Sequence, residues 1–156
     1  LIKAFKEVSK VYDCKLLIIG KGKERENLEK LIIKLNLQEK IFMPGFKKNP
    51  FKYLKQSDVF VLSSKYEGLP NSLIQAFLLD IPCIATDCKS GPREILNDGE
   101  FGQLVEVGDY YQMSEAIINV FNKNWTKKGK KEEDGRFDKI TILNRYLDIP
   151  MFKIRS

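Results

Sequence analysis

The sequence predicts an α/β fold in which helices cover both faces of a parallel β-sheet. Short apolar runs of four to seven residues alternate along the chain with stretches of helical periodicity. Such runs are typical of strands buried on both faces, and their alternation with helices is typical of βαβ units. A chain of 156 residues, 43% of them hydrophobic, is long and apolar enough to bury the core of one such domain.

The first half of the chain shows both periodicities. Apolar residues recur at helical spacing from Leu1 to Val8, and again in ERENLEKLIIKLNL. The runs KLLIIG and KIFMPG are short and end at glycine, as buried strands often do. We therefore expect a helix over 1–12, a strand over 15–20, a helix over 24–37, a strand over 40–45 and a short helix over 50–56.

The second half repeats the pattern. DVFVLSS is the clearest strand of the chain, and the helical stretch NSLIQAFLLD ends before Pro82, which cannot continue it. We expect strands over 58–64, 83–86 and 101–106, and helices over 71–80, 92–96 and 110–122.

The character of the sequence changes at Lys123. Residues 123–139 are highly charged and show little periodicity, and 140–147 is the only later stretch that favours a short helix. We expect one domain over 1–122, followed by a charged connection and a C-terminal helix or tail over 123–156. The chain starts within a helical pattern and without Met, so it is expected to be a piece of a longer protein.

Composition excludes several classes of function. The chain has no histidine, so the commonest general base and transition-metal ligand is missing, and no metal site is expected. Cys14, Cys83 and Cys88 show no CxxC spacing, and an odd count without a disulfide framework favours a reducing compartment. Cys14 and Cys83 lie in apolar strand-like runs and are expected to pack as small core residues. No apolar run reaches the roughly 18 residues of a membrane span.

The net charge of +6 admits a nucleic-acid partner, but the pattern of charge disfavours one. The basic residues are dispersed, and only 123–131 forms a run. Just two aromatic residues, Trp125 and Phe137, flank it, whereas single-stranded nucleic acids bind to interleaved aromatic platforms. We expect a solvated basic surface and no nucleic acid.

A parallel sheet with helices on both faces binds ligands at the carboxyl ends of its strands. The candidate loops are 20–23, 44–48, 63–70 and 87–91. The first, GKGKER, suggests a dinucleotide fingerprint, but Arg25 stands where the third glycine is needed. A tight strand-to-helix turn is the simpler interpretation, with Lys21 and Lys23 available to face an anion.

The most informative loop lies in SSKYEGLPNSLIQA, residues 63–76. It joins the carboxyl end of a strand to the amino end of a helix, whose free N–H groups favour phosphate. Gly68 lets the backbone approach a ligand closely, Pro70 suits the start of a helix, and Asn71 or Ser72 is expected to cap it.

Two side chains in this segment are suited to hydroxyl groups. The Glu67 carboxylate would repel a phosphate but accepts hydrogen bonds from hydroxyls. Gln75 stands about one turn into the helix, roughly 5 Å along the axis from its amino end. An anion site between two hydroxyl-binding groups suits a sugar nucleotide. On spacing alone, a capped turn with a solvent-exposed glutamate is the favoured explanation of the segment.

Three stretches carry a closer resemblance: LLIIGKGKERENLEKLI, then IFMPGFKKNPFKYLKQSDVFVLSSKYEGLPNSLIQAFLLDIPCIATDCKSGPREIL, and NDGEFGQLVEVGD. Over residues 15–120 the chain resembles the C-terminal, donor-binding domain of retaining glycosyltransferases of family 4. The resemblance implies a Rossmann-like domain that forms one half of a GT-B fold.

The resemblance also implies roles for individual residues. Glu67 would be the catalytic residue that contacts the donor sugar, and position 75 would hold the ribose hydroxyls. The loop 45–47 would contact the base, and the backbone around 68–72 would hold the diphosphate. The implied donor-binding residues are Gly20, Lys21, Gly45, Phe46, Lys47, Ser64, Gly68, Leu69, Pro70, Asn71, Ser72 and Gln75.

The implied reaction is transfer of a hexose or N-acetylhexosamine, with retention, from a nucleotide donor of the UDP-sugar type. The leaving diphosphate would itself act as base. No metal or other cofactor is implied, because no metal-ligand set appears and the helix end can stabilise the leaving group. The acceptor would be a bacterial glycan or a lipid-linked sugar, bound by an N-terminal domain upstream, where the phosphate-clamping Arg and Lys also lie. The implied location is the cytoplasm or, peripherally, the inner membrane face, and the chain alone is expected to be inactive.

One residue departs from the family pattern, because position 75 is Gln rather than Glu. An amide loses the charge-assisted hydrogen bond, which is roughly twice as strong as a neutral one. A degenerate, non-catalytic module that binds nucleotide sugar weakly or only packs against a partner is therefore an alternative. A sugar-nucleotide 2-epimerase of the same fold is a further one, disfavoured by SGPREIL and the lack of histidine.

Overall fold

Every element predicted before residue 122 is present in the structure. The computed structural model describes residues 1–124, so the predicted tail over 125–156, with its short helix, lies outside the described residues. The helices are α1 (Ile2–Val11), α2 (Arg25–Lys34), α3 (Phe51–Leu54), α4 (Asn71–Leu78), α5 (Pro92–Ile95) and α6 (Tyr110–Phe121). The strands are β1 (Leu16–Ile19), β2 (Ile41–Gly45), β3 (Phe60–Leu62), β4 (Cys83–Thr86) and β5 (Gln103–Val105).

Four helices, α2, α4, α5 and α6, end earlier than the sequence predicted because each of them closes on a left-handed residue that is not glycine. After α2, Asn36 has φ of 54°, and the Leu37 N–H donates to Ile32 O at 3.1 Å. This is the Schellman arrangement, in which the residue after the C-cap reverses the chain. The same arrangement ends three more helices, with the left-handed residues Asp80, Asn97 and Lys123.

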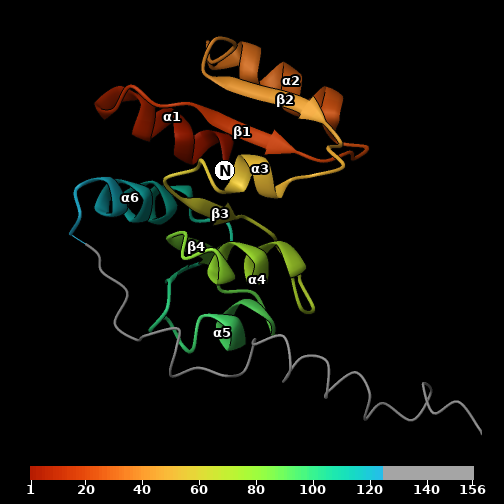
Figure 1. Cartoon of the computed structure of the whole chain (residues 1–156). Helices are drawn as coiled ribbons and strands as arrows, with labels where there is room; N and C mark the ends of the chain where they lie inside the picture. The colour runs from red at the N-terminus through yellow and green to blue at the C-terminus, as the bar shows by residue number, and fades with distance from the viewer. Residues whose placement is uncertain (125–156) are drawn as a thin grey trace, which may run out of the picture.

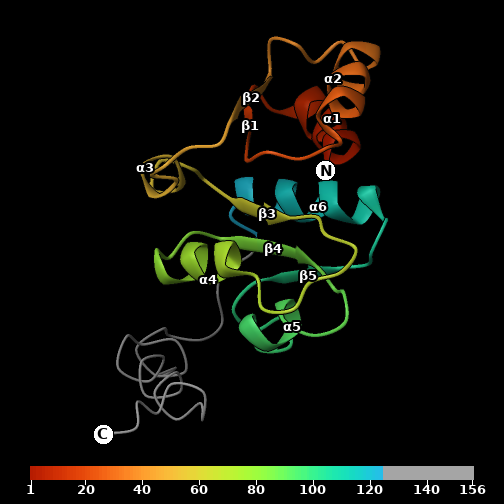
Figure 2. The ribbon, with the colours of Figure 1, turned by 90° about the vertical axis from the view of Figure 1, so that its right-hand side faces the viewer.

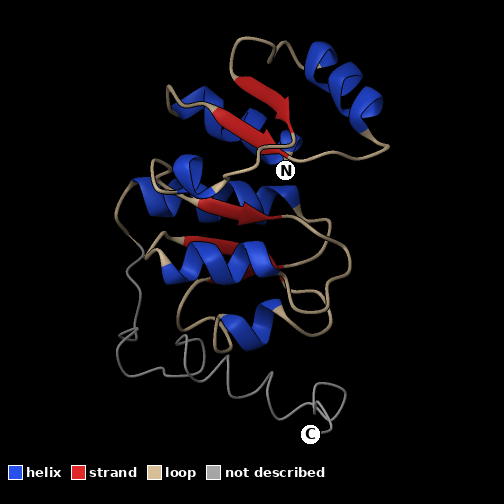
Figure 3. Cartoon of the chain, turned by 45° about the vertical axis from the view of Figure 1, so that its right-hand side comes forward, coloured by secondary structure: helices blue, strands red, loops and turns tan. Residues whose placement is uncertain are grey.

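The strands form two parallel groups. β1 pairs with β2, and β4 pairs with β3 on one edge and with β5 on the other. No ladder joins β1 to β3 within residues 1–124. The strand arrows nevertheless point to the same side of the molecule, so the loops that follow them gather at one edge (Figure 1, Figure 3).

The core lies on both sides of β4, whose residues alternate between the two faces. Cys83 and Ala85 pack with residues of α4 and α5, whereas Ile84 packs with residues of α1 and α6. All four residues of β4 are buried. Figure 2 shows the resulting arrangement, with β3 between α6 and α4. The predicted α/β fold with helices on both faces of a parallel sheet is confirmed.

The β1–β2 group has a separate core. Ile2 and Phe5 of α1 pack there with Ile32, Leu37 and Ile41. Ile32 lies in α2, Leu37 follows that helix, and Ile41 is the first residue of β2. Through the described residues, 1–124, no helix combines the length and the apolar character needed to cross a membrane.

The double-sided burial of β4 predicts a large effect of truncation at its centre. Ile84 has no exposed surface, so Ile84→Ala should lower the free energy of unfolding by about 2–5 kcal/mol through lost contacts and a cavity. Urea denaturation followed by circular dichroism measures the change. The matched control is Ile33→Ala on α2, whose side chain is 59% exposed and whose loss should change stability by less than about 0.5 kcal/mol. Equal effects of the two substitutions would contradict this account of the core.

Candidate functional site

The carboxylate of Glu67 is held at the end of β3 by hydrogen bonds rather than left free in solvent. The Ser64 hydroxyl donates to Glu67 Oε1 at 2.6 Å. Ser64 is itself held by the neighbouring strand, because the Thr86 hydroxyl donates to the Ser64 carbonyl at 2.5 Å. A buried residue of β4 thereby fixes the loop from which Glu67 projects.

The loop 87–91 supports the loop 64–70 from the other side. The Ser90 hydroxyl donates to the Glu67 carbonyl at 3.2 Å. Gly91 has φ of +61°, and a Cβ placed there would lie 1.9 Å from the carbonyl oxygen of Gly68. The two loops are therefore in direct backbone contact, and only glycine fits at position 91. A Cβ on Gly68, by contrast, meets no atom within 4 Å, so space is open beside it.

Thr86, Ser90 and Gly91 are not among the predicted donor-binding residues, although 87–91 was a candidate loop and SGPREIL was among the stretches that carried the resemblance. A signal was available in Gly91 directly before Pro92, since this pair marks a turn into a helix.

The amino end of α4 is open to solvent. The helix begins at Asn71 with Pro70 as N-cap, and no side chain caps it. The prediction that Asn71 or Ser72 caps this helix is wrong, because both lie inside the first turn. Pro70 O accepts from the N–H groups of Leu73 and Ile74. The N–H groups of Asn71 and Ser72 have no acceptor among residues 1–124, and an anion is attracted to such a terminus.

Gln75 lies one turn further along α4. Its side chain is partly buried, and its amide makes no hydrogen bond with another described residue. The residues beside it, Ile74 and Ala76, point into the core. Gln75 is therefore placed on the border between the core and the open side of the helix, with its amide available to a ligand.

The loops after β1 and β2 are tied to each other. The Gly20 N–H donates to Gly45 O at 3.1 Å, and the Arg25 guanidinium donates to Met43 O at 2.9 Å. Arg25 also pairs with Glu29 at 2.8 Å. Arg25, which interrupts the glycine pattern, thus joins α2 to β2. This contact supports the interpretation of GKGKER as a structural turn rather than a dinucleotide-binding loop.

Three side chains of these loops remain exposed to different degrees. Phe46 is 66% exposed, Lys21 is exposed and Lys47 is partly buried. The carboxyl edge of the strands thus brings the predicted residues into two groups, one around Glu67 and α4 and one at the ends of β1 and β2. No hydrogen bond or ion pair links the two groups in the part of the chain that the structure describes.

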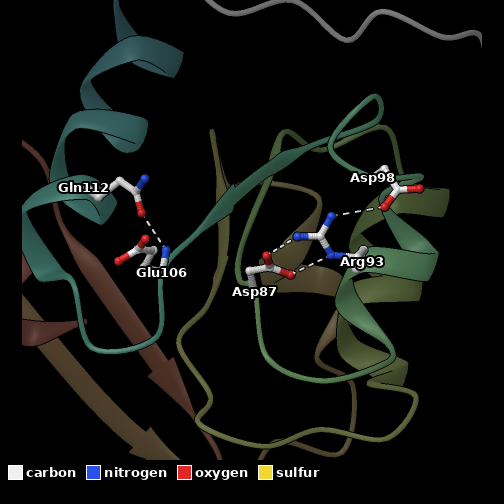
Figure 4. A network of polar contacts seen from close by, with 5 residues as sticks. All are labelled: Asp87, Arg93, Asp98, Glu106 and Gln112. Atoms are coloured by element: carbon white, nitrogen blue, oxygen red, sulfur yellow. Dashed lines mark hydrogen bonds and ion pairs between the residues drawn. The ribbon is translucent and has the colours of Figure 1, made fainter.

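A charged network braces the loop 87–91 from α5. Arg93 donates from Nε to Asp87 Oδ1 at 3.0 Å, forms a second hydrogen bond with the same carboxylate, and donates to Asp98 Oδ1 at 3.1 Å (Figure 4). The hydrogen bond with Asp87, followed by that with Asp98, raises the pKa of Arg93. Because two carboxylates already occupy this guanidinium, its role is to hold the loop. In a separate contact, the Gln112 side chain accepts from the Glu106 N–H at 2.5 Å (Figure 4).

The contact between the two loops predicts that Gly91→Ala destabilises the domain. The methyl group would collide with Gly68 O in a left-handed conformation, at an expected loss of roughly 1–3 kcal/mol in unfolding free energy. Thermal and urea denaturation measure it. Gly22→Ala is the control, because a Cβ there meets no atom within 4 Å. If Gly91→Ala were as stable as this control, the two loops would not be packed together as described.

Comparison with known proteins identifies the family. The family described as glycosyl transferases group 1 matches residues 1–136. An uncharacterized glycosyltransferase of Methanocaldococcus jannaschii is 54% identical over 97 residues, which cover 62% of this chain and 24% of that protein.

A second relative matches over nearly the whole chain. The N-acetylgalactosamine-N,N'-diacetylbacillosaminyl-diphospho-undecaprenol 4-alpha-N-acetylgalactosaminyltransferase of Campylobacter jejuni is 36% identical over 146 residues. The match covers 91% of this chain and 40% of that enzyme. The chain thus spans less than half the length of these relatives.

Solved structures agree on the fold. A TarM variant of S. aureus in complex with fondaparinux, alpha-GlcNAc-glycerol and UDP superposes with a TM-score of 0.78 at 28% identity, over 94% of this chain and 32% of that one. HepE of Anabaena in complex with UDP superposes with a TM-score of 0.79 at 19% identity, over 94% of this chain and 42% of that one. The Rossmann-like fold is thereby confirmed, and it matches GT-B glycosyltransferase structures. The chain belongs to the glycosyl transferases group 1 family.

Proposed function

We propose that this chain is the donor-binding part of a retaining glycosyltransferase of family 4, which transfers a hexose or N-acetylhexosamine from a UDP-sugar. The observation that carries the proposal is the pairing of an anchored carboxylate, Glu67, with the open amino end of α4. One group suits the hydroxyls of a sugar, the other suits a diphosphate, and a single loop joins them.

The chemistry of each group gives the orientation of the donor. The diphosphate would lie at the free N–H groups of Asn71 and Ser72, beside the open space at Gly68. Glu67 would then accept from hydroxyls of the sugar, and Gln75 from a ribose hydroxyl. The base would extend toward Phe46, whose exposed ring offers a stacking surface.

In this proposal the protein contributes positioning and charge stabilisation. The acceptor attacks the anomeric carbon on the face that the diphosphate leaves, and the leaving group takes the proton. The N–H groups at the start of α4 stabilise the negative charge that develops on the diphosphate. Glu67 orients the sugar, because Ser64 and the loop 87–91 hold it before any ligand binds. The proposal requires no metal, since the helix terminus carries the stabilising partial charge.

The relatives support the class of donor and acceptor. The C. jejuni enzyme is named for transfer of N-acetylgalactosamine to a diphospho-undecaprenol-linked sugar, and the TarM structure holds UDP. By analogy we propose a glycan or lipid-linked acceptor, bound by an N-terminal domain of the full-length protein. The cytoplasm, or the inner face of the membrane, is the matching location for such a donor and acceptor.

A degenerate donor-binding module is the second candidate, and Gln75 is the observation that favours it. A neutral amide in the ribose position weakens donor binding relative to a carboxylate. Titration calorimetry of the 156-residue chain with UDP, UDP-sugars and GDP-mannose separates the two candidates. Binding of UDP that Gln75→Glu tightens supports the donor-binding function. No binding of any nucleotide, with no effect of Gln75→Glu, supports a degenerate module that only packs against a partner.

Restoring the carboxylate should strengthen binding. We expect Gln75→Glu to tighten UDP binding by about tenfold, roughly 1.4 kcal/mol, because the ribose hydroxyls would then donate to a charged acceptor. Calorimetric titration with UDP measures the effect. The matched control is Gln38→Glu at an exposed position after α2, which adds the same charge and should leave affinity unchanged. Equal affinities in the parent chain and Gln75→Glu would remove the ribose assignment.

Removal of the sugar contact should discriminate between ligands. Glu67→Ala should weaken binding of a UDP-sugar by about 1.5–3 kcal/mol while leaving UDP itself nearly unaffected, because the carboxylate is assigned to the sugar alone. The ratio of the two dissociation constants is the measured quantity. Glu115→Ala, at an exposed position on α6, is the control for loss of charge. Equal weakening of UDP and UDP-sugar would place Glu67 in a structural role.

A further inference from the structure

Charge is divided unevenly between the two parts of this domain. Residues 1–59, which hold β1, β2 and helices α1 to α3, contain 14 lysines and arginines and 7 aspartates and glutamates, a net charge of +7. Residues 60–124, which hold the remaining strands and helices, contain 4 and 9 such residues, a net charge of −5. The β1–β2 group and the β3–β5 group lie at opposite ends of the molecule (Figure 1). The domain therefore has a basic part that an anionic partner would meet first.

Within the basic part, the stretch 41–57 has no acidic residue to compensate its positive charge. It contains no Asp or Glu but four lysines, Lys47, Lys48, Lys52 and Lys55. Elsewhere in this part, lysines such as Lys10 and Lys40 pair with a carboxylate. None of the four forms an ion pair or a side-chain hydrogen bond within residues 1–124. Their charge is therefore available to a ligand or a surface.

The helix α3 presents part of this stretch to solvent. Leu54 packs against the core shared by α4 and α5. Phe51 is 43% exposed, and Lys52 and Lys55 are exposed as well. Phe51 and Lys55 stand four residues apart and so share one face of the helix. Figure 2 shows α3 on the outside of the molecule, on the side away from α1 and α2. The exposed Lys48 lies just before this helix. We call Lys48, Phe51, Lys52 and Lys55 the α3 surface.

An exposed aromatic ring among unpaired lysines fits a membrane better than other anionic partners. Each ammonium group close to an anionic bilayer strengthens binding by about fivefold, and an apolar ring enters the layer of lipid headgroups. Single-stranded nucleic acid binds to several interleaved rings, whereas the α3 surface has one. The core of a protein–protein interface is poor in lysine, which makes up most of the α3 surface. We propose that the α3 surface binds the anionic lipids of a membrane.

This contact would hold the candidate site beside the membrane. Phe51 inserts among the headgroups, and the lysines of the α3 surface face the lipid phosphates. Phe46 and Lys47 are left out of the contact, because they belong to the loop of the candidate site that follows β2. Since α3 comes directly after that loop, a lipid-linked acceptor would lie close to it. This last consequence rests on the proposed function, whereas the lipid contact itself requires no nucleotide.

Sedimentation with lipid vesicles tests the proposal. The 156-residue chain is mixed with vesicles of phosphatidylcholine alone, or of phosphatidylcholine and phosphatidylglycerol in equal parts. The salt concentration is about 0.1 M, at which charges act over roughly 10 Å. The bound fraction gives a partition coefficient. We expect binding to the anionic vesicles to be roughly tenfold or more stronger than to the neutral ones, and to weaken as salt is added.

A matched pair of charge variants locates the contact. Lys52→Gln together with Lys55→Gln should lower the partition coefficient on anionic vesicles by roughly twentyfold. The control is Lys30→Gln together with Lys34→Gln, which removes the same charge from exposed positions on α2 and should lower it by less than about threefold. The basic run 123–131 is unchanged in both variants, so it contributes equally. Circular dichroism verifies that each variant is folded.

A second pair of variants tests the aromatic contact. Phe51→Ala should lower the partition coefficient by about threefold, because the ring no longer enters the headgroup layer. The control is Ile33→Ala on α2, which removes an apolar side chain that is 59% exposed and should leave binding unchanged. Equal effects of these two substitutions would remove Phe51 from the contact and contradict the proposal.

Three further outcomes would overturn the inference. The first is no binding to anionic vesicles, or equal binding to both kinds. The second is an equal loss from the charge variants on α3 and on α2, which would mean that the net charge of the chain carries binding. The third is tighter binding of a single-stranded oligonucleotide, lost with Lys52→Gln and Lys55→Gln, which would make the partner a nucleic acid. A chain that binds anionic vesicles through α3 but does not bind UDP supports this inference and removes the donor assignment.

Discussion

The arrangement of this domain depends on β4, a strand that is paired on both edges and buried on both faces. Its ladders with β3 and β5 set the direction in which the neighbouring strands run. Its side chains alternate between the core under α4 and α5 and the core under α1 and α6. Because the carboxyl ends of parallel strands meet at one edge, this single strand also determines where the loops of the candidate site gather.

The candidate site is built on backbone contacts that begin at the end of β4. Thr86 holds the carbonyl of Ser64, and Ser64 holds the carboxylate of Glu67. Gly91 allows the next loop to touch Gly68, and Arg93 braces that loop through Asp87. These groups are engaged with one another, whereas the N–H groups of Asn71 and Ser72 and the amide of Gln75 are not. The first set of residues shapes the site, and the second set is available to bind a ligand.

The relation between the two sheet groups rests on helices rather than on a ladder. α1 contributes to both cores, and no strand pairing joins β1 to β3 among the described residues. Apolar packing is non-directional, so it holds the two groups together without any backbone hydrogen bonds between β1 and β3. The loops after β1 and β2 therefore lie on the same side as the Glu67 loop but make no polar contact with it, and a bound donor would be one way to join them.

The sequence by itself determined the type and order of every helix and strand up to Phe121, because apolar periodicity reports directly on which faces are buried. It also located the loop around Glu67, since a strand end meeting a helix start is visible in local pattern. It did not give the helix ends, because Asn36, Asp80 and Asn97 take left-handed conformations that glycine usually marks. Only the tertiary structure decided the rest: that Pro70 rather than Asn71 is the N-cap, that Thr86 and Gly91 shape the Glu67 loop, and that the sheet divides at β1 and β3. These features arise from contacts between residues far apart in the chain, and local periodicity carries no information about such contacts.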